Sequence, residues 1–551
     1  MKFPSATTVA SSTRARRSRG ATVSAPSPLW SNIASSTERA ARLVAVDRVA
    51  LLAATLLGFG LYLRALGRFA FTADEAVYSA WARHAFHGDP WFLTVWPDKP
   101  PLFLWTLGAA FMTLGNRPEA AQFLNIGFST LTIAVAGVTA RTLWGAPAGV
   151  TAAALMALNP FVVSFAPTAF TDPMLVFAGM TALLLAVRGR AGWAGVWLGV
   201  AVMTKQTGVL YAPLVVGALR LNLVRPRAVL PWLRSVGGLL LVIGPVVLWD
   251  SRRWAVAPSP WDLSVRNYGA LALAPVDTWP ARLHAWRAPL GFLLADGVAW
   301  GVLVLLLVVA AWCAWRTRPT PHADMAALLA LWSAAFVGLH VGTTVPAWDR
   351  YLLPLAPMLA LLAAWGIATI SRHAPRVAAA TALLLVLTLL RPAVTAAAGG
   401  LPVGGDKGAY TGLPAALAWL DEHVEASPET PYVLYHSRLG WHFQYYLFDA
   451  DAAGAVDLRW FPSTTYLADN AEKTPHRRTF FLEPEWDAQP DLARRLAMRD
   501  LTVTTRGRFG RFTLYEIVPG PDAAARTLCA WCVSRRPSES ESASPAPGQT
   551  P

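Results

Sequence analysis

Apolar residues of this chain are gathered in long blocks that short polar segments separate. A helix needs about 20 predominantly apolar residues to cross a bilayer. The pattern therefore predicts an α-helical polytopic membrane protein with about 11 transmembrane helices. We expect these helices at 50–66, 120–140, 146–165, 172–187, 191–204, 208–223, 236–249, 289–315, 323–345, 351–370 and 377–390.

Clusters of arginine between the apolar blocks predict the orientation, because basic loops stay on the cytoplasmic side. The clusters are the N-terminal tail, Arg188/Arg190, Arg220/Arg225/Arg227, Arg316/Arg318 and Arg372/Arg376. They all face the cytoplasm only if the shorter apolar stretch 101–114 does not cross the membrane. We therefore expect two interfacial helices, at 75–86 and 101–114, in the first outer loop.

The hydropathy pattern changes after residue 399. Residues 413–423 have the pattern of an amphipathic helix. Short stretches rich in β-branched and aromatic residues predict strands at 431–436, 478–482, 501–505 and 512–518. The chain is thus expected to contain a disordered basic cytoplasmic tail (1–48), a transmembrane domain (49–395), a small extracytoplasmic α/β domain (399–520) and a disordered tail (521–551).

Composition narrows the classes of function. The chain has 551 residues, of which 54% are hydrophobic and 15% charged, and its net charge is +14. The arginines lie between apolar runs, which indicates membrane topology and disfavours nucleic acid as a partner. Three cysteines are too few for a disulfide scaffold. Cys529 and Cys532 predict a local disulfide or a chance pair. The expected location is the cell (plasma) membrane.

Asp74 and Glu75 follow the first apolar block and precede a helical stretch. Charged groups beside hydrocarbon are costly and usually functional. A carboxylate here can act as a general base toward an acceptor hydroxyl. The structural alternative is an acidic first turn that the helix dipole favours. The pattern leaves both readings open.

Asp98-Lys99-Pro100-Pro101 places one cation before a rigid entry into the stretch 101–114. Lys99 can bind a lipid phosphate as a point charge and neutralise a leaving group. The alternative is a lysine that anchors the helix among lipid headgroups.

Further polar residues lie at the predicted outer ends of spans. Asp172 can be an N-cap or a second carboxylate of the same cavity. Lys205 can extend toward the interface or line the cavity, and Arg350 offers a bidentate grip on phosphate. His340, inside a span, is expected to be packed and hydrogen-bonded.

Five motifs within 50–395 resemble those of the protein O-mannosyltransferase and lipid A aminoarabinose transferase group, the dolichyl-phosphate-mannose-protein mannosyltransferase family of GT-C glycosyltransferases. They are, in order, Asp74-Glu75, Asp98-Lys99-Pro100-Pro101, Thr171-Asp172-Pro173, Thr204-Lys205 and Arg350-Tyr351-Leu352-Leu353-Pro354. The family fold also has two interfacial helices in the first outer loop. The chain lacks a clear counterpart of the Trp-Trp-Asp signature of oligosaccharyltransferases, which disfavours transfer of a whole oligosaccharide.

The resemblance implies transfer of a sugar, with inversion, from a polyprenyl-phosphate donor in the membrane lipid to an extracytoplasmic acceptor, which can be a protein, a glycan or a lipid. It implies that Asp74, with Glu75, is the catalytic base or acceptor-orienting group. The substrate-binding residues implied are Lys99, Asp172, Lys205, Arg350, Tyr351 and Tyr78. Some relatives hold a divalent metal ion, and Asp98 and His284 are the candidate ligands.

Two other classes of function remain in view. A secondary transporter would place ionisable residues near mid-bilayer on broken helices and show repeat symmetry. A non-catalytic membrane scaffold would present the α/β domain to a partner. Neither accounts for Asp74, Lys99 and Arg350 on one membrane face.

Overall fold

The computed structural model describes residues 28–222, 229–269, 272–316, 323–474 and 476–521. The chain divides into two units, residues 1–49 and residues 50–551. The tail predicted at 521–551 lies almost wholly outside the described residues. The tail predicted at 1–48 lies partly outside them. The described part of that segment, from Pro28 onward, is helical. The first helix therefore begins at Pro28 and not at residue 50, where the sequence predicts its start.

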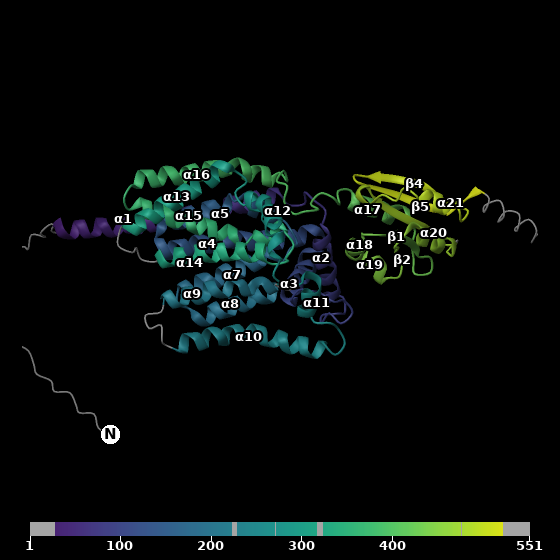
Figure 1. Ribbon diagram of the computed structural model, residues 1–551, viewed down its shortest axis with the longest axis horizontal. Coiled ribbons are helices and arrows are strands. Elements are labelled where there is room, and N and C mark those ends of the chain that lie inside the picture. The colour runs from purple at the N-terminus through teal and green to yellow at the C-terminus, as the bar shows by residue number, and fades with distance from the viewer. Residues whose placement is uncertain (1–27, 223–228, 270–271, 317–322, 475, 522–551) are drawn as a thin grey trace, which may run out of the picture. The chain divides into compact units, whose positions relative to one another are not determined.

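The described residues from Pro28 to Ala397 are mostly helical (Figure 1). Its α-helices are α1 (Pro28–Arg64), α2 (Ala73–Phe86), α3 (Pro101–Leu114), α4 (Pro118–Trp144), α5 (Ala146–Ala157), α6 (Pro160–Phe165), α7 (Asp172–Val187), α8 (Ala191–Thr204), α9 (Ala212–Asn222), α10 (Val229–Arg253), α11 (Pro260–Tyr268), α12 (Trp279–Phe292), α13 (Gly297–Arg316), α14 (Ala323–Gly342), α15 (Leu355–Ser371) and α16 (Pro375–Ala397). Short 3₁₀ helices are η1 (Gln206–Tyr211), η2 (Val276–Thr278) and η3 (Asp349–Leu352).

Seven helical segments within the described residues are long and apolar enough to cross a membrane, and four shorter apolar helices accompany them. The chain is therefore a multi-pass membrane protein. The number of about 11 crossings and the interfacial position of α2 and α3 stay predictions. α3, at 14 residues, is too short to span a bilayer when straight.

Several predicted spans differ in detail from the structure, and the one expected at 208–223 is divided into η1 and α9. The span expected at 146–165 is divided into α5 and α6, because Pro160 starts a new helix and the Asn159 side chain caps it by accepting from the Val162 N–H at 3.0 Å. The span expected from residue 289 begins at Gly297, and Pro289 lies inside α12 instead.

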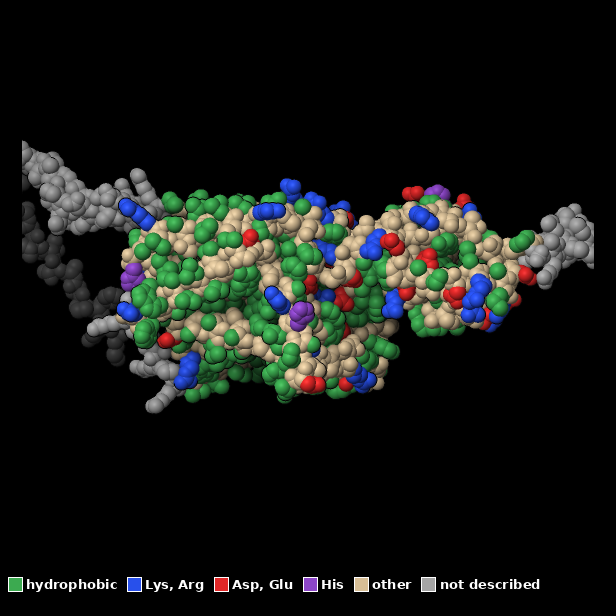
Figure 2. Space-filling model, turned by 45° about the horizontal axis from the view of Figure 1, so that its top comes forward, with side chains coloured by type: hydrophobic (Ala, Val, Ile, Leu, Met, Phe, Trp, Pro, Cys, Tyr) green, Lys and Arg blue, Asp and Glu red, His purple; other side chains and the backbone are tan. Residues whose placement is uncertain are grey.

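Burial separates inner from outer helices. α15 lies in the centre of the helical part. In its apolar stretch 89% of the residues are buried, whereas in that of α10 only 6% are. Figure 2 shows hydrophobic side chains spread over the outer surface of these helices. Apolar residues on an outer helix face are what a lipid environment requires.

The C-terminal α/β domain contains a five-stranded sheet of order β2-β1-β3-β5-β4. Its strands are β1 (Tyr432–His436), β2 (Val456–Trp460), β3 (Thr479–Pro484), β4 (Leu501–Phe509) and β5 (Phe512–Pro519). Its helices are α17 (Leu413–His423), α18 (Gly440–Tyr446), α19 (Phe448–Ala452), η4 (Glu485–Asp487), α20 (Thr464–Glu472) and α21 (Leu492–Ala497). β1 pairs parallel with β2 and β3, while β5 pairs antiparallel with β3 and β4.

The sequence predicted four of these five strands and placed α17 at its observed bounds. It missed β2, in which Asp457 and Arg459 interrupt the apolar pattern and only Val456 is buried. Hydrophobic clusters cover the two faces of the sheet, one containing α17 and α18 and the other α20 and α21. A sheet covered on both faces is typical of an α/β domain.

Candidate active site

The carboxylate of Asp74 forms an ion pair with the guanidinium of Arg350. Asp74 lies in the first turn of α2, and Arg350 lies in η3, immediately before α15. Three aromatic rings surround the Arg350 guanidinium, with centroids 4.8 Å (Phe170), 4.7 Å (Trp348) and 5.6 Å (Tyr351) away. Such stacking fixes the plane of a guanidinium. Arg350 is therefore a rigid partner for Asp74.

Lys99 and its neighbour Asp98 form a second buried pair. The Lys99 ammonium lies 2.9 Å from Asp98 and donates to the Tyr268 hydroxyl at 3.1 Å. Pro100 and Pro101 keep the chain extended up to the first turn of α3, so Lys99 stays at the helix entrance. Burial lowers the pKa of the Lys99 ammonium, and the charge of Asp98 opposes that shift. The Lys99 ammonium is thus shielded from water, and its interaction with a nearby negative charge is stronger there than in solvent.

Lys205 and Asp172 form a third pair, 2.7 Å apart. Lys205 occupies the break between α8 and η1, and Asp172 is in the first turn of α7. The Lys205 ammonium also lies 4.4 Å from the centroid of the Tyr351 ring. Burial lowers the pKa of Lys205 to about 8, although Asp172 favours its charged form.

A cavity of about 320 Å³ opens beside the two lysines. Lys99, Lys205 and Tyr351 line it, and the lining surface is predominantly apolar. The other lining residues are Gln206, Thr207, Val209, Leu210, Trp261, Ser264, Val265, Tyr268, Leu339, His340, Thr343 and Val345. An apolar cavity with a few convergent polar groups is typical of a ligand site. Its charges suit an anion attached to a hydrocarbon chain.

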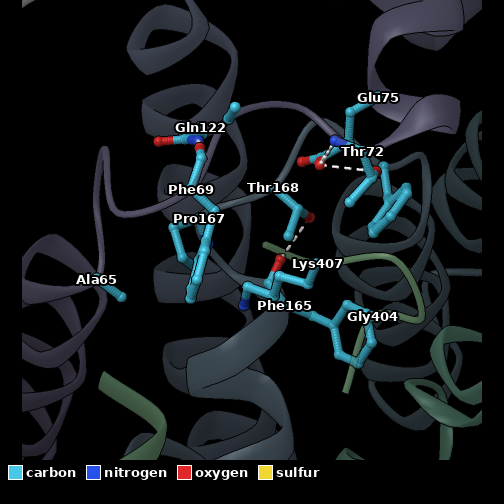
Figure 3. Close-up of a pocket in the computed structure, with 12 residues that line it drawn as sticks. Ala65, Phe69, Thr72, Glu75, Gln122, Phe165, Pro167, Thr168, Gly404 and Lys407 are labelled. Atoms are coloured by element: carbon cyan, nitrogen blue, oxygen red, sulfur yellow. Dashed lines mark hydrogen bonds between the residues drawn. The ribbon is translucent and has the colours of Figure 1, made fainter. Parts of the chain in front are cut away.

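Glu75 is adjacent to Asp74 in sequence but has a different environment. One of its oxygens accepts from the Thr72 N–H at 2.9 Å and hydroxyl at 2.8 Å, and the other accepts from the Ala169 N–H at 2.7 Å. Figure 3 shows Glu75 beside Thr72 in a small buried pocket. Burial raises the pKa of Glu75. The bond from the Thr72 N–H belongs to the capping box of α2, and the bond from the Ala169 N–H ties the helix to the loop after α6, which fits a positioning role.

Tyr78, one helical turn after Asp74, is buried. The Lys99 ammonium lies 5.9 Å from the centroid of its ring. The structure thus brings together Asp74, Tyr78, Lys99, Asp172, Lys205, Arg350 and Tyr351, which the sequence predicts as site residues.

The proposed metal ligands do not fit a divalent cation. Asp98 already accepts from the Lys99 ammonium at 2.9 Å and from the Asn267 amide at 3.2 Å. His284 is exposed on α12. Among the described residues, no group of three or more His, Cys, Asp or Glu side chains is arranged to hold a metal ion. A divalent cation at Asp98 would have to displace an ammonium group, so no chemical step is assigned to a metal here.

Sequence reasoning missed several residues that complete this site. Asn267 and Tyr268 end α11 and hold the Asp98–Lys99 pair. Phe170 and Trp348 flank Arg350. Only their positions in the sequence point to them. Asn267 and Tyr268 lie between the predicted spans 236–249 and 289–315, and the two aromatic residues lie close to predicted site residues.

The geometry supports one kind of chemistry. Two lysines and an arginine can bind and neutralise a phosphate, and a partly exposed carboxylate stands beside them. The adjoining cavity is suited to hydrocarbon. A reaction that releases a lipid-linked phosphate while a carboxylate accepts a proton needs these parts.

Residues 98–249 match the family model described as dolichyl-phosphate-mannose-protein mannosyltransferase. The fold is similar to that of ArnT from Cupriavidus metallidurans bound to undecaprenyl phosphate, with 16% identity, a TM-score of 0.57, and coverage of 85% of this chain and 97% of that chain. For the same protein in the apo state the identity is 18%, the TM-score 0.57, and the coverage 88% and 98%. No curated protein matches the chain.

Proposed function

Since the chain is a multi-pass membrane protein with the GT-C fold and a segment that matches the dolichyl-phosphate-mannose-protein mannosyltransferase family, we propose that it is a glycosyltransferase. It takes a sugar from a polyprenyl-phosphate donor and transfers it to a hydroxyl of an extracytoplasmic acceptor. The observation that carries this proposal is the Asp74–Arg350 pair beside two buried lysines at the wall of an apolar cavity.

The donor binds with its phosphate against Lys99, Lys205 and Arg350, and with the start of its isoprenoid chain in the cavity. ArnT, whose fold this chain shares, binds undecaprenyl phosphate. The phosphate replaces Asp74 as the partner of Arg350, whereas the lysine ammonium groups, with three N–H donors each, can bind it while they keep Asp98 and Asp172. Charge-assisted hydrogen bonds of this type are shorter and stronger than neutral ones.

The reaction is a single displacement at the anomeric carbon. Asp74 accepts the proton of the acceptor hydroxyl, whose oxygen forms a bond to the anomeric carbon as the bond to the phosphate oxygen breaks. The leaving polyprenyl phosphate keeps the electron pair, and Lys99 and Arg350 stabilise its added charge. Attack from the face opposite the phosphate inverts the anomeric configuration.

The donor and Asp74 are proposed to lie on the extracytoplasmic side. The arginine clusters support this orientation, because they place the N-terminal tail and the loops after α7 and α13 in the cytoplasm. The C-terminal α/β domain then lies outside the cell as well.

The proposal is tested by mass spectrometry of cell-envelope glycans, glycoproteins and lipids from cells with and without this gene. We expect one sugar modification to disappear in the deletion and to return with the wild-type gene but not with Asp74→Asn. An unchanged envelope in the deletion strain would overturn the proposal.

The second candidate function is a secondary transporter of a lipid or small solute. It differs in chemistry, because a transporter leaves the sugar–phosphate bond intact. Purified protein in nanodiscs, supplied with the donor and with acceptor from the deletion strain, should release polyprenyl phosphate. Movement of intact donor without that product would favour transport.

A further inference from the structure

The segment Gly404-Gly405-Asp406-Lys407 connects α16 to α17 and so links the helical part to the C-terminal α/β domain. Gly404 and Gly405 have φ angles of +93° and +65°, in the left-handed region that favours glycine. The turn therefore has a specific conformation that these glycines permit. Three contacts tie it to elements around the candidate site.

The first contact holds the helix that carries Asp74. The Asp406 carboxylate accepts a hydrogen bond from the Ala73 N–H at 3.0 Å, although 333 positions separate the two residues. Ala73 is the first residue of α2, and the first N–H groups of a helix lack partners within the helix. Asp406 thus caps α2 from a distant part of the chain, one residue before Asp74.

The second contact holds the short helix that carries Arg350. The Gly404 N–H donates to one oxygen of Asp349 at 2.6 Å, and the other oxygen of Asp349 accepts from the Arg350 N–H at 2.7 Å. One carboxylate therefore joins the segment to the start of η3. The two members of the Asp74–Arg350 pair are both anchored to residues 404–406.

The third contact reaches the C-terminal end of α6. The Lys407 ammonium donates to the Ser164 carbonyl at 3.0 Å and lies 5.1 Å from the centroid of the Phe69 ring. Figure 3 shows Lys407 and Gly404 lining the same pocket as Glu75 and Thr168. Its free volume is about 10 Å³, room for one water molecule at most. Burial lowers the pKa of Lys407, and the charges of Glu75 and Asp349 oppose the shift.

We propose that residues 404–407 are a positioning segment, which sets the placement of Asp74 relative to Arg350 and so couples the C-terminal domain to sugar transfer. This inference rests on the proposed function. It adds that a connecting segment outside the membrane helices determines how the reacting groups are placed. None of the three contacts involves Lys99 or Lys205. Donor phosphate binding by the lysines is therefore independent of the segment. Arg350 is tied to it only through Gly404 and Asp349, a link that Asp406 and Lys407 do not form, whereas alignment of the base depends on Asp406.

The test compares Asp406→Ala with Asp406→Asn and Lys407→Met. Misplacement of a reacting group by about 1 Å costs on the order of 10²-fold in rate. We expect Asp406→Ala to lower kcat roughly 10- to 100-fold and to change the donor KM less than about twofold. Asparagine keeps an oxygen that can accept from Ala73, so Asp406→Asn should recover most of the rate. Glu422→Ala, an exposed acidic residue of α17, is the matched control.

Rates are measured as polyprenyl phosphate released per folded protein, with the donor sugar identified from the cell comparison. If Asp406→Ala does not fold, Lys407→Met is read by the same criterion, with a loss of kcat and an unchanged donor KM. Hydrogen exchange adds a second readout, and the amides of residues 72–76 should exchange faster in either variant. Full kcat in the variants, or a loss confined to KM, overturns the positioning role. Inactive wild-type protein would instead overturn the proposed function.

Discussion

Asp74 and Arg350 form an ion pair in which the two partners are unequally exposed. The side chain of Asp74 is 35% exposed, whereas that of Arg350 is 12% exposed and stacked among three aromatic rings. The arginine is thus the fixed member, and the carboxylate is the member that a substrate can reach. In the proposed mechanism, a phosphate that binds the Arg350 guanidinium frees the Asp74 carboxylate to accept a proton from a hydroxyl.

Replacing Asp74 by asparagine removes the base and keeps the size of the side chain. We expect Asp74→Asn to fold and insert normally and to lower sugar transfer by at least about 10²-fold, since general base help contributes about 10²–10⁴-fold. The measurement is polyprenyl phosphate release in detergent. Asp277→Asn, at an exposed residue of η2, is the control. Wild-type activity in Asp74→Asn would remove this carboxylate from the mechanism.

Replacing Lys99 by alanine should weaken donor use. A hydrogen bond to a charged group contributes about 1.5–3 kcal/mol, which corresponds to a rise in donor KM of roughly 10- to 100-fold. Lys473→Ala, at an exposed lysine of the C-terminal domain, should leave KM unchanged. A dependence on donor concentration like that of the wild type would argue against contact between Lys99 and the phosphate.

Activity should decline on the alkaline side because a cation is lost. The pKa of Lys205 is lowered by burial to about 8. The ammonium is present below that pH and is lost as pH rises through it, so kcat/KM for the donor should fall above about pH 8. Arginine stays charged throughout this range. The pH profile of Lys205→Arg should therefore keep its plateau to higher pH, and identical profiles would contradict the assignment.

Chelation should leave transfer unchanged. The oxygens of Asp98 already bind Lys99 and Asn267, so a divalent cation has no vacant carboxylate at this position. We expect equal rates before and after dialysis against EDTA, measured with metal-free donor and buffers. Loss of activity that returns with one added metal ion would show that Asp98 exchanges its partners for a metal.

Filling the cavity should discriminate between donors by chain length. Ser264 lines the cavity of about 320 Å³. The indole of Ser264→Trp would occupy space that the isoprenoid chain needs, so a long-chain polyprenyl donor should lose activity while a donor with a short, water-soluble chain keeps it. Equal losses with both donors would place the lipid elsewhere.

The sequence predicted the membrane-protein fold well because its signals are local. Apolar blocks and flanking arginines locate helices, and α17 ends where its amphipathic pattern ends. The pairing of Asp74 with Arg350 was not predicted as a contact. It was only expected that both would lie on one membrane face, and the structure brings them together.

Other features depend on contacts that no local pattern encodes. Tyr268 and Asn267 end α11, a short helix that the sequence analysis did not predict, and Asp406 caps a helix that begins 333 residues earlier. β2 was missed because charged residues alternate within it. The double contact of Glu75 with Thr72 and Ala169 shows how an acidic residue next to Asp74 can serve the backbone instead.

Each cation of the centre is paired with a carboxylate: Lys99 with Asp98, Lys205 with Asp172 and Arg350 with Asp74. The charges of the centre are therefore balanced, which lowers the cost of keeping six ionised groups beside hydrocarbon. In the proposed reaction the donor phosphodiester adds one negative charge to this centre, and the charge that the phosphate gains on cleavage is offset by the proton that Asp74 takes up. When Asp74 loses that proton before the next turnover, its restored charge competes with the phosphate for Arg350 and so favours release of the product.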